Sequence, residues 1–96
     1  MDTEWIFEWD ERKRRSNLSK HRLDFADCRA VFRGRVLTCV DGGDDYGEVR
    51  FLTRGLLRSR VVVVAHTEVR NVIRVISMRR AATHEEADYF ENAFPD

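Results

Sequence analysis

Four consecutive valines, Val61–Val64, constrain the fold of this chain more than any other feature of its sequence. Because neighbouring side chains in a strand point to opposite faces, an unbroken apolar run must be buried on both faces. We therefore predict a central strand over residues 61–66, with helices on one face and other structure on the opposite face. The run is far shorter than the roughly 18 apolar residues of a membrane helix, so we expect a cytoplasmic protein that does not contact membranes.

Hydrophobic periodicity predicts the elements around this strand. It indicates strands over residues 4–9, 36–40, 48–54 and 72–78, a turn beginning at Gly55, and helices over residues 11–21 and 24–34. A capping box at Thr83–Glu86 predicts a C-terminal helix whose inner stripe is Ala87, Phe90 and Phe94. Because helices precede and follow the run of strands, the pattern is typical of an α+β fold. We expect one domain, residues 1–96, with an N-terminal strand and two helices, a four-stranded antiparallel meander and a C-terminal helix.

Charge is segregated along the chain although it sums to zero. Residues 50–80 contain eight arginines and one acid, Glu68, whereas residues 81–96 contain five acids and neither Lys nor Arg. Salt confines the field of each charge to about 8–10 Å, so an arginine-rich patch on a neutral protein can still bind a phosphate backbone. Arginine suits phosphate because its planar guanidinium donates two parallel hydrogen bonds.

The last predicted strand carries arginines on both faces. Arg74 lies on one face and Arg79 on the other, and Arg80 follows at the strand end. Two interpretations stay open, because these residues could present guanidinium groups to a phosphate or could form ion pairs. The acids available for such pairs are Glu48, Glu85 and Glu86.

Two of the three histidines are candidates for chemistry. His21 ends the first predicted helix, where a cation is favoured by the helix dipole. His66 ends the central strand, where it is either a hydrogen-bonded core residue or a general acid or base. The sequence contains no metalloprotease, hydrolase-elbow or nucleotide-binding motif and no visible cluster of metal ligands. We therefore expect neither a metal nor a cofactor.

Several short motifs occur in a characteristic order along the chain. They are Phe7–Asp10, Asn17–His21, Phe25, Val31–Phe32, Gly47–Arg50, Val61–Thr67, Ile73–Ala81, Glu85 and Tyr89. With this order and spacing, residues 5–90 resemble the BrnT family, the ribonuclease toxins of BrnT/BrnA type II toxin-antitoxin pairs. Two positions depart from the family pattern, since Arg22 stands where glycine is usual and Val69-Arg70 stands where Arg-Gly is usual.

The resemblance implies a fold similar to that of the RelE toxins and an endoribonuclease that inhibits translation by cleaving RNA. It also implies a cognate BrnA-like antitoxin as the partner. In the resulting hetero-oligomer, the toxin contacts operator DNA only indirectly, through the antitoxin.

Metal-free RNA cleavage requires a base for the 2′-hydroxyl proton, cations for the phosphorane charge and an acid for the 5′-oxygen. With the resemblance, the catalytic candidates are Arg70, Arg79 and Arg80 on the scissile phosphate, with His66 or His21 as acid or base. The candidates for substrate binding are Arg50, Arg74, Lys20, Glu48 and Tyr89. Two alternatives are a noncatalytic module whose basic face binds an acidic partner, and a degenerate toxin that binds antitoxin without cutting RNA.

Overall fold

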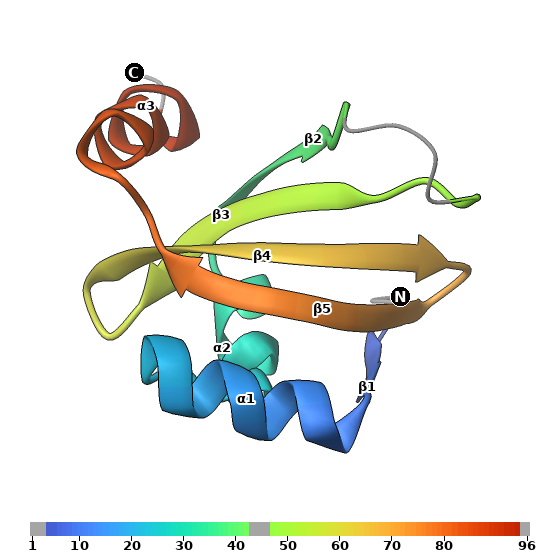
Figure 1. Cartoon of the computed structure of the whole chain (residues 1–96). Coiled ribbons are helices and arrows are strands. Elements are labelled where there is room, and N and C mark those ends of the chain that lie inside the picture. Colours follow the sequence, from blue (N-terminus) through green and yellow to red (C-terminus); the bar gives the residue numbers. More distant parts are fainter. Residues whose placement is uncertain (1–3, 43–46, 95–96) are drawn as a thin grey trace.

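The valine run lies in β4 (Arg60–Val69), the middle strand of a sheet with the order β1-β5-β4-β3-β2 (Figure 1). The computed structural model describes residues 4–42 and 47–94. The other elements, in chain order, are β1 (Ile6–Trp9), α1 (Glu11–His21), the 3₁₀ helix η1 (Phe25–Asp27), α2 (Cys28–Arg33), β2 (Val36–Val40), β3 (Phe51–Leu57), β5 (Val72–Arg80) and α3 (Thr83–Ala93). The predicted central position of the valine strand is confirmed.

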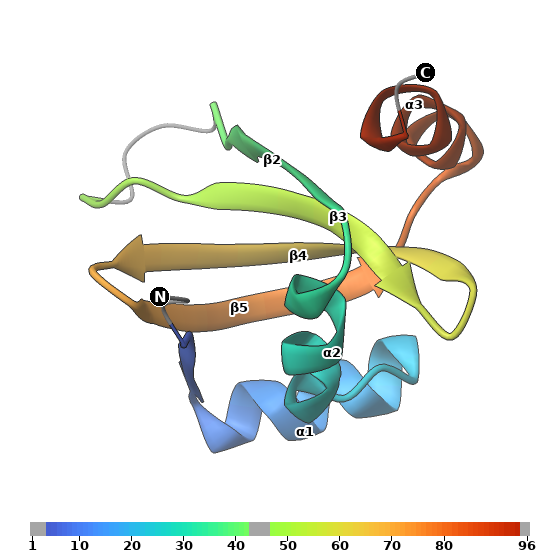
Figure 2. The same ribbon diagram turned by 180° about the vertical axis from the view of Figure 1, so that it is seen from behind.

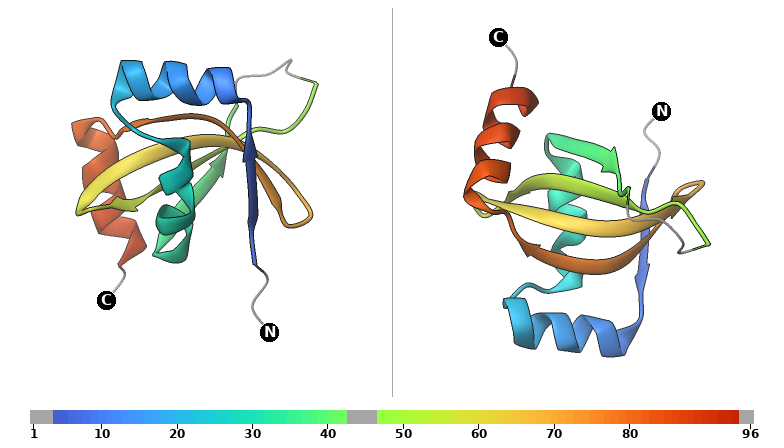
Figure 3. Two further views of the ribbon diagram at one scale, coloured as in Figure 1. Left: turned by 90° about the horizontal axis from the view of Figure 1, so that it is seen from below. Right: turned by 45° about the horizontal axis from the view of Figure 1, so that its top comes forward.

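The sheet is mixed, with five strands in the described residues. Strands β2 to β5 are antiparallel neighbours, but β1 adds in parallel to the edge of β5, with Ile6 opposite Val72. The α+β class is confirmed, and the predicted four-stranded antiparallel sheet is corrected to a five-stranded mixed one. Hydrophobic period is a local signal, so it carries no information about pairing between strands so far apart in the chain. Figure 3 shows β1 at the end of the sheet away from α3.

Both faces of β4 are covered, as the valine run requires. On one face Val62 and Val64 join a core with η1 and α2 that includes Phe25 and Val31, and Figure 2 shows α2 lying across this face. On the opposite face Val61 packs with residues of α3. The sheet therefore has one extensively packed face and one face that α3 covers near β2.

Helix α1 begins and ends where the sequence predicts. The Asp10 carboxylate accepts hydrogen bonds from the backbone N–H groups of Arg12 and Lys13 at 2.9 and 3.1 Å, which satisfies two otherwise free donors at the helix N-terminus. After His21, Arg22 takes the left-handed conformation, with φ of 61°. The helix therefore ends with the backbone geometry that ordinarily favours glycine.

An amide side chain docks α1 on the sheet. Asn17 is buried, and its Nδ2 donates to the carbonyl oxygens of Met78 and Leu23 at 2.9 and 3.1 Å. Its Oδ1 accepts from the Met78 N–H at 3.1 Å. Asn17 thus bonds both backbone groups of Met78, on β5 beyond the stretch that pairs with β1. Because His21 lies one turn after Asn17, the same contact brings His21 to the edge of β5.

Gly55 lies inside β3 and not in a turn, so the predicted strand 48–54 and its turn are both corrected. A Cβ at Gly55 would lie 2.7 Å from Val31 Cγ1, so the absent side chain is what allows α2 to pack directly on the sheet. The chain reverses at Arg58 and Ser59, which have φ of 50° and 66°. These two residues form a two-residue hairpin turn between β3 and β4.

Helix α3 starts one position earlier than the predicted capping box. Its N-cap is Ala82, and the Glu85 carboxylate accepts a hydrogen bond from the Ala82 N–H at 2.7 Å. The sequence instead predicts a capping box of Thr83 and Glu86, because the capping-box pattern has a hydroxyl side chain at the N-cap. No helix in the described part of the chain is long and apolar enough to span a membrane.

The inner stripe predicted for α3 was wrong. Ala87, Phe90 and Phe94 are exposed, the two phenylalanines by 46% and 41%. The buried residues of the helix are Glu85, Tyr89 and Ala93. Hydrophobicity favoured the phenylalanines, but a carboxylate and a phenol can be buried when their polar atoms find hydrogen-bond partners.

Candidate nucleic-acid interface

The seam between α1 and β5 contains a hollow of about 290 Å³ with cationic walls. It is lined by Lys13, Ser16, Asn17, Lys20, His21, Ile76 and Ser77. His21 is half-buried there, and imidazole is the side chain that most readily accepts and donates protons near neutral pH. The structure therefore brings together two of the sequence-predicted residues, Lys20 and His21. We call this site the α1–β5 hollow.

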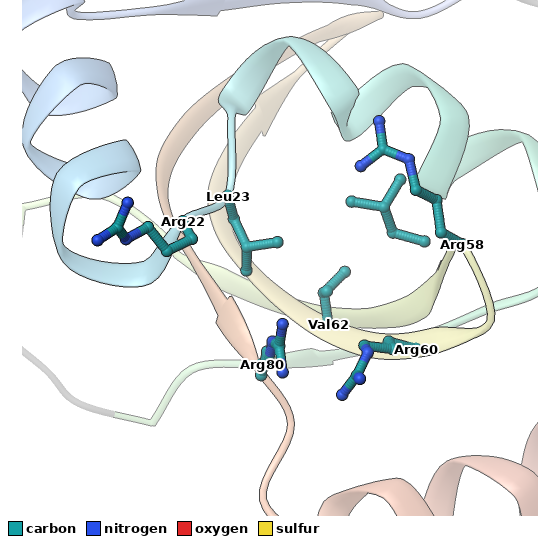
Figure 4. A pocket seen from close by; sticks show the side chains of 7 residues that line it. Arg22, Leu23, Arg58, Arg60, Val62 and Arg80 are labelled. Carbon is teal, nitrogen blue, oxygen red and sulfur yellow. The ribbon is translucent and has the colours of Figure 1, made fainter.

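A second hollow, of about 180 Å³, lies at the C-terminal end of α1. Four arginines and three apolar residues line it, namely Arg22, Arg58, Arg60, Arg80, Leu23, Leu57 and Val62. Figure 4 shows the arginine side chains spread around the apolar ones. One arginine follows α1, one lies in the β3–β4 turn, one begins β4 and one ends β5. We call the four arginines the arginine rim, and the three apolar residues the apolar floor.

The arginine rim keeps most of its charge unpaired. Within residues 4–42 and 47–94, no carboxylate forms an ion pair with Arg22, Arg60 or Arg80. Arg58 lies 3.9 Å from Asp27, and its side chain is 78% exposed, so this contact contributes little. The rim is therefore a concentration of positive charge available to an anion.

Two of the rim arginines lie on backbone that favours glycine. Arg22 has φ of 61° and Arg58 has φ of 50°. A left-handed conformation costs a residue with a Cβ roughly 1–2 kcal/mol, and such residues are concentrated at functional sites, where the surrounding structure holds them. The chain thus places these two guanidinium groups beside the apolar floor at a cost in stability.

Arg79 and Arg80 do not share a site, because adjacent strand residues point to opposite faces. Arg79 donates to both carboxylate oxygens of Glu85 at 2.8 and 2.9 Å. Arg54 bonds Asp88 of the same helix at 2.6 Å. The ion-pair interpretation therefore matches Arg79, whereas Arg80 has no such partner among the described residues. Arg79 and Arg54 tie α3 to the sheet.

The Arg79–Glu85 pair predicts a loss of stability in acid. Hydrogen bonds from Arg79 are the main reason that the pKa of Glu85 falls from 4.5 to about 2. Because the folded pKa is below the unfolded one, this stabilisation is complete above about pH 4.5 and is lost as the pH falls toward 2. Since Arg79 is 43% exposed, we expect about 1–3 kcal/mol and not the full linkage value. Urea unfolding at a series of pH values measures it.

The matched controls for this prediction are two glutamine variants of α3. Glu85→Gln should remove this part of the pH dependence, whereas Glu86→Gln should leave it unchanged, because Glu86 is exposed. Equal acid sensitivity in the wild type and in Glu85→Gln would contradict the assignment of the acid-labile group to Glu85.

His66 and Tyr89 are core residues. The His66 ring is fully buried and stacks on Phe51, with Nε2 2.7 Å from the Thr53 hydroxyl. Burial lowers the pKa of His66, which favours the neutral ring. This geometry matches the hydrogen-bonded core histidine, and an acid or base role would require the ring to become exposed. Tyr89 is also fully buried, and its hydroxyl donates to the Arg35 carbonyl at 2.7 Å.

The other candidates are dispersed. Arg70 lies in the turn between β4 and β5, at the opposite end of β5 from Arg80. At about 3.3 Å per residue, β5 separates them by over 25 Å, so they do not grip one phosphate. Arg74 is exposed and forms an ion pair with β1. Arg50 and Glu48 precede β3 and line neither hollow.

Sequence reasoning missed three members of the arginine rim, Arg22, Arg58 and Arg60. They come together only because the end of α1 and the β3–β4 turn meet at the end of β5. The segment Leu57–Arg60 did contain a signal, since two arginines flank a single serine between strands. The sequence does not reveal this signal, because the turn is predicted at Gly55 and not at Arg58 and Ser59.

The fold and the site define a small α+β domain with cationic side chains around two hollows. The family model of the ribonuclease toxin BrnT of type II toxin-antitoxin systems matches residues 9–85. The crystal structure of the Brucella abortus ribonuclease toxin BrnT, at 1.1 Å resolution, matches with a TM-score of 0.66 and 32% sequence identity, covering 84% of this chain and 100% of that one. No curated protein matches.

The chain therefore belongs to the BrnT family of ribonuclease toxins of type II toxin-antitoxin systems. The family resemblance seen in the sequence is confirmed.

Proposed function

We propose that this protein is a metal-independent endoribonuclease that inhibits translation by cleaving RNA, and that a BrnA-like antitoxin neutralises it. Membership of a ribonuclease toxin family supports this proposal. The observation that carries it is that two consecutive residues at the end of α1, His21 and Arg22, line the α1–β5 hollow and the arginine-rimmed hollow respectively. A side chain that can transfer protons serves the acid and base steps of the reaction, and a guanidinium with no ion-pair partner among the described residues serves the phosphorane charge.

The reaction transfers the phosphoryl group within the RNA, from the 5′-oxygen to the neighbouring 2′-oxygen. The 2′-oxygen forms a bond to phosphorus while the bond to the 5′-oxygen breaks, which leaves a 2′,3′-cyclic phosphate and a 5′-hydroxyl. We assign the 2′-hydroxyl proton to the His21 imidazole, which can then deliver it to the departing 5′-oxygen. Arg80 stabilises the charge that develops on the phosphorane. Lys20, beside His21 in the α1–β5 hollow, adds positive charge near the same phosphate.

Arg79 has a different part in this proposal. Its guanidinium group already donates two hydrogen bonds to the Glu85 carboxylate. We therefore propose that Arg79 holds α3 against the sheet and does not bind the phosphate. Among the remaining candidates, Arg74 and Arg50 lie outside both hollows and are suited to contacts with more distant parts of the RNA.

The antitoxin proposal follows from the same charges. An inhibitor that covers the arginine rim must carry acidic groups, because it competes with RNA for the guanidinium groups. Binding only the folded toxin, it should also raise the Tm of the toxin by mass action. The toxin would then meet operator DNA only through the antitoxin.

Cleavage of single-stranded RNA by the purified chain tests the proposal. We expect cleavage that persists in the presence of a chelator, with 2′,3′-cyclic phosphate ends, and no cleavage of a substrate whose 2′-hydroxyl is replaced by 2′-O-methyl. In cells, induction should arrest growth, and co-expression of the antitoxin encoded beside it should restore growth.

Two outcomes would contradict it. RNA left intact at high protein concentration, together with tight antitoxin binding, would identify a degenerate toxin or a noncatalytic module. Cleavage that stops on chelation would show that a metal supplies the charge assigned to arginine.

A further inference from the structure

We infer that the arginine rim and its apolar floor form a subsite for single-stranded RNA beside the cleaved bond, with backbone phosphates on the rim and an unpaired base on the floor. The inference rests on the proposed function, because it assigns the RNA strand a path leading away from His21. It adds Arg22, Arg58 and Arg60 to the residues that contact substrate.

The spacing of the rim favours a polyanion with several phosphates. The four side chains come from three places in the fold and stand around the floor without meeting at one point (Figure 4). A single small anion needs guanidinium groups that converge on it. Groups spread around a hollow instead match successive phosphates of one strand, and three of the four lack an ion-pair partner in the described residues.

The floor supplies the second element of RNA recognition. Leu23, Leu57 and Val62 give the hollow an apolar base within about 180 Å³. Proteins recognise single-stranded RNA through bases that leave the stack and rest on apolar or guanidinium surfaces. A protein segment with only acidic side chains would use the rim but would gain little from the floor, so the combination favours RNA over such a segment.

The two hollows lie where one RNA strand can contact both. His21 lines the first hollow and Arg22 the second, and they are consecutive residues at the end of α1. Along β5, Ser77 lines the first and Arg80 the second, on opposite faces of the sheet, so the hollows meet only at the end of α1. An RNA strand whose scissile phosphate lies beside His21 can therefore continue past Arg22 over the apolar floor.

The backbone of the rim agrees with a binding role. Arg22 and Arg58 are held with positive φ, where glycine would be less strained. Replacement of Arg22 by glycine should therefore raise the Tm and weaken RNA binding together. A purely structural role for Arg22 predicts that the Tm falls.

Binding of a short single-stranded 2′-O-methyl RNA, measured by fluorescence anisotropy between about 50 and 200 mM salt, tests the inference. This RNA cannot be cleaved, so binding is measured whether or not the chain is catalytic. We expect the double variant Arg58→Gln/Arg60→Gln to bind about tenfold more weakly, with the salt slope reduced by about 1.4, or about 0.7 for each lost phosphate contact. Arg22→Gly should bind more weakly with a higher Tm.

The control is Arg15→Gln, which removes one positive charge, half of what the double variant removes, from an exposed position on the side of α1 away from Asn17. Its affinity should stay within about twofold of the wild type. A double variant that binds RNA as Arg15→Gln does would overturn the inference. So would a double variant that keeps its RNA affinity but loses an acidic antitoxin, because the rim would then be a protein interface. If the wild type binds this RNA but cuts no RNA, the proposed function fails and the subsite stands.

Discussion

Arg80→Ala should lower kcat/KM for RNA cleavage by about 10²–10³, which is the usual effect of removing one group that stabilises the charge of a transition state. Arg80 is exposed, and no carboxylate pairs with it in the described residues, so its loss leaves no buried charge behind. We therefore expect the Tm to stay close to that of the wild type. Cleavage rates of a defined RNA and thermal unfolding of the same preparations measure both effects.

Two neighbouring variants make this expectation specific. Arg80→Lys should recover only part of the rate, because an ammonium group lacks the planar fork. Arg79→Ala should show the opposite pattern, with a clear loss of stability, because the buried Glu85 carboxylate would keep its charge without its main partner. Wild-type cleavage by Arg80→Ala would remove Arg80 from the proposed site.

Asn17→Leu should lower the free energy of unfolding by about 2–4 kcal/mol. The substitution keeps the side-chain size but leaves the N–H and the carbonyl of Met78 without the amide that bonds them, and each buried unsatisfied group costs about 1–3 kcal/mol. For a domain of this size, we expect a fall in Tm of roughly 10–20 °C. Urea and thermal unfolding measure the change.

Ser19→Ala is the matched control for Asn17. It changes an exposed residue on the same helix and should shift the free energy of unfolding by less than about 0.5 kcal/mol. If Asn17→Leu were as stable as the wild type, the hydrogen bonds of Asn17 would not be what holds α1 to β5.

Most of the local structure could be predicted from the sequence, because its causes are local. The apolar run of Val61–Val64 can be buried on both faces only in a central strand, and Asp10 before a polar helical stretch is an N-cap by its chemistry. The order of elements could be predicted for the same reason. The pairing of β1 with β5 could not, since it joins opposite ends of the chain.

The candidate site was less predictable, because its parts are brought together by tertiary structure. Residue type and the family resemblance predict Lys20, His21 and Arg80, and the structure places the first two in the α1–β5 hollow and Arg80 in the arginine rim. Arg58 and Arg60 are not predicted as site residues, because a glycine at position 55 is typical of a turn. In fact, Gly55 is a contact with α2 that no local pattern reveals.

The parallel pairing of β1 has a consequence for the order in which the molecule is made. Ile6 leaves the ribosome before its partner Val72, which is 66 positions later in the chain. The hydrogen bonds of the Asn17 amide likewise cannot form before Met78, which follows Val72 in the chain, has left the ribosome. Neither hollow can form while β5 is inside the ribosomal tunnel, because residues of β5 line both. The surface proposed to bind RNA therefore exists only after β5 has left the tunnel.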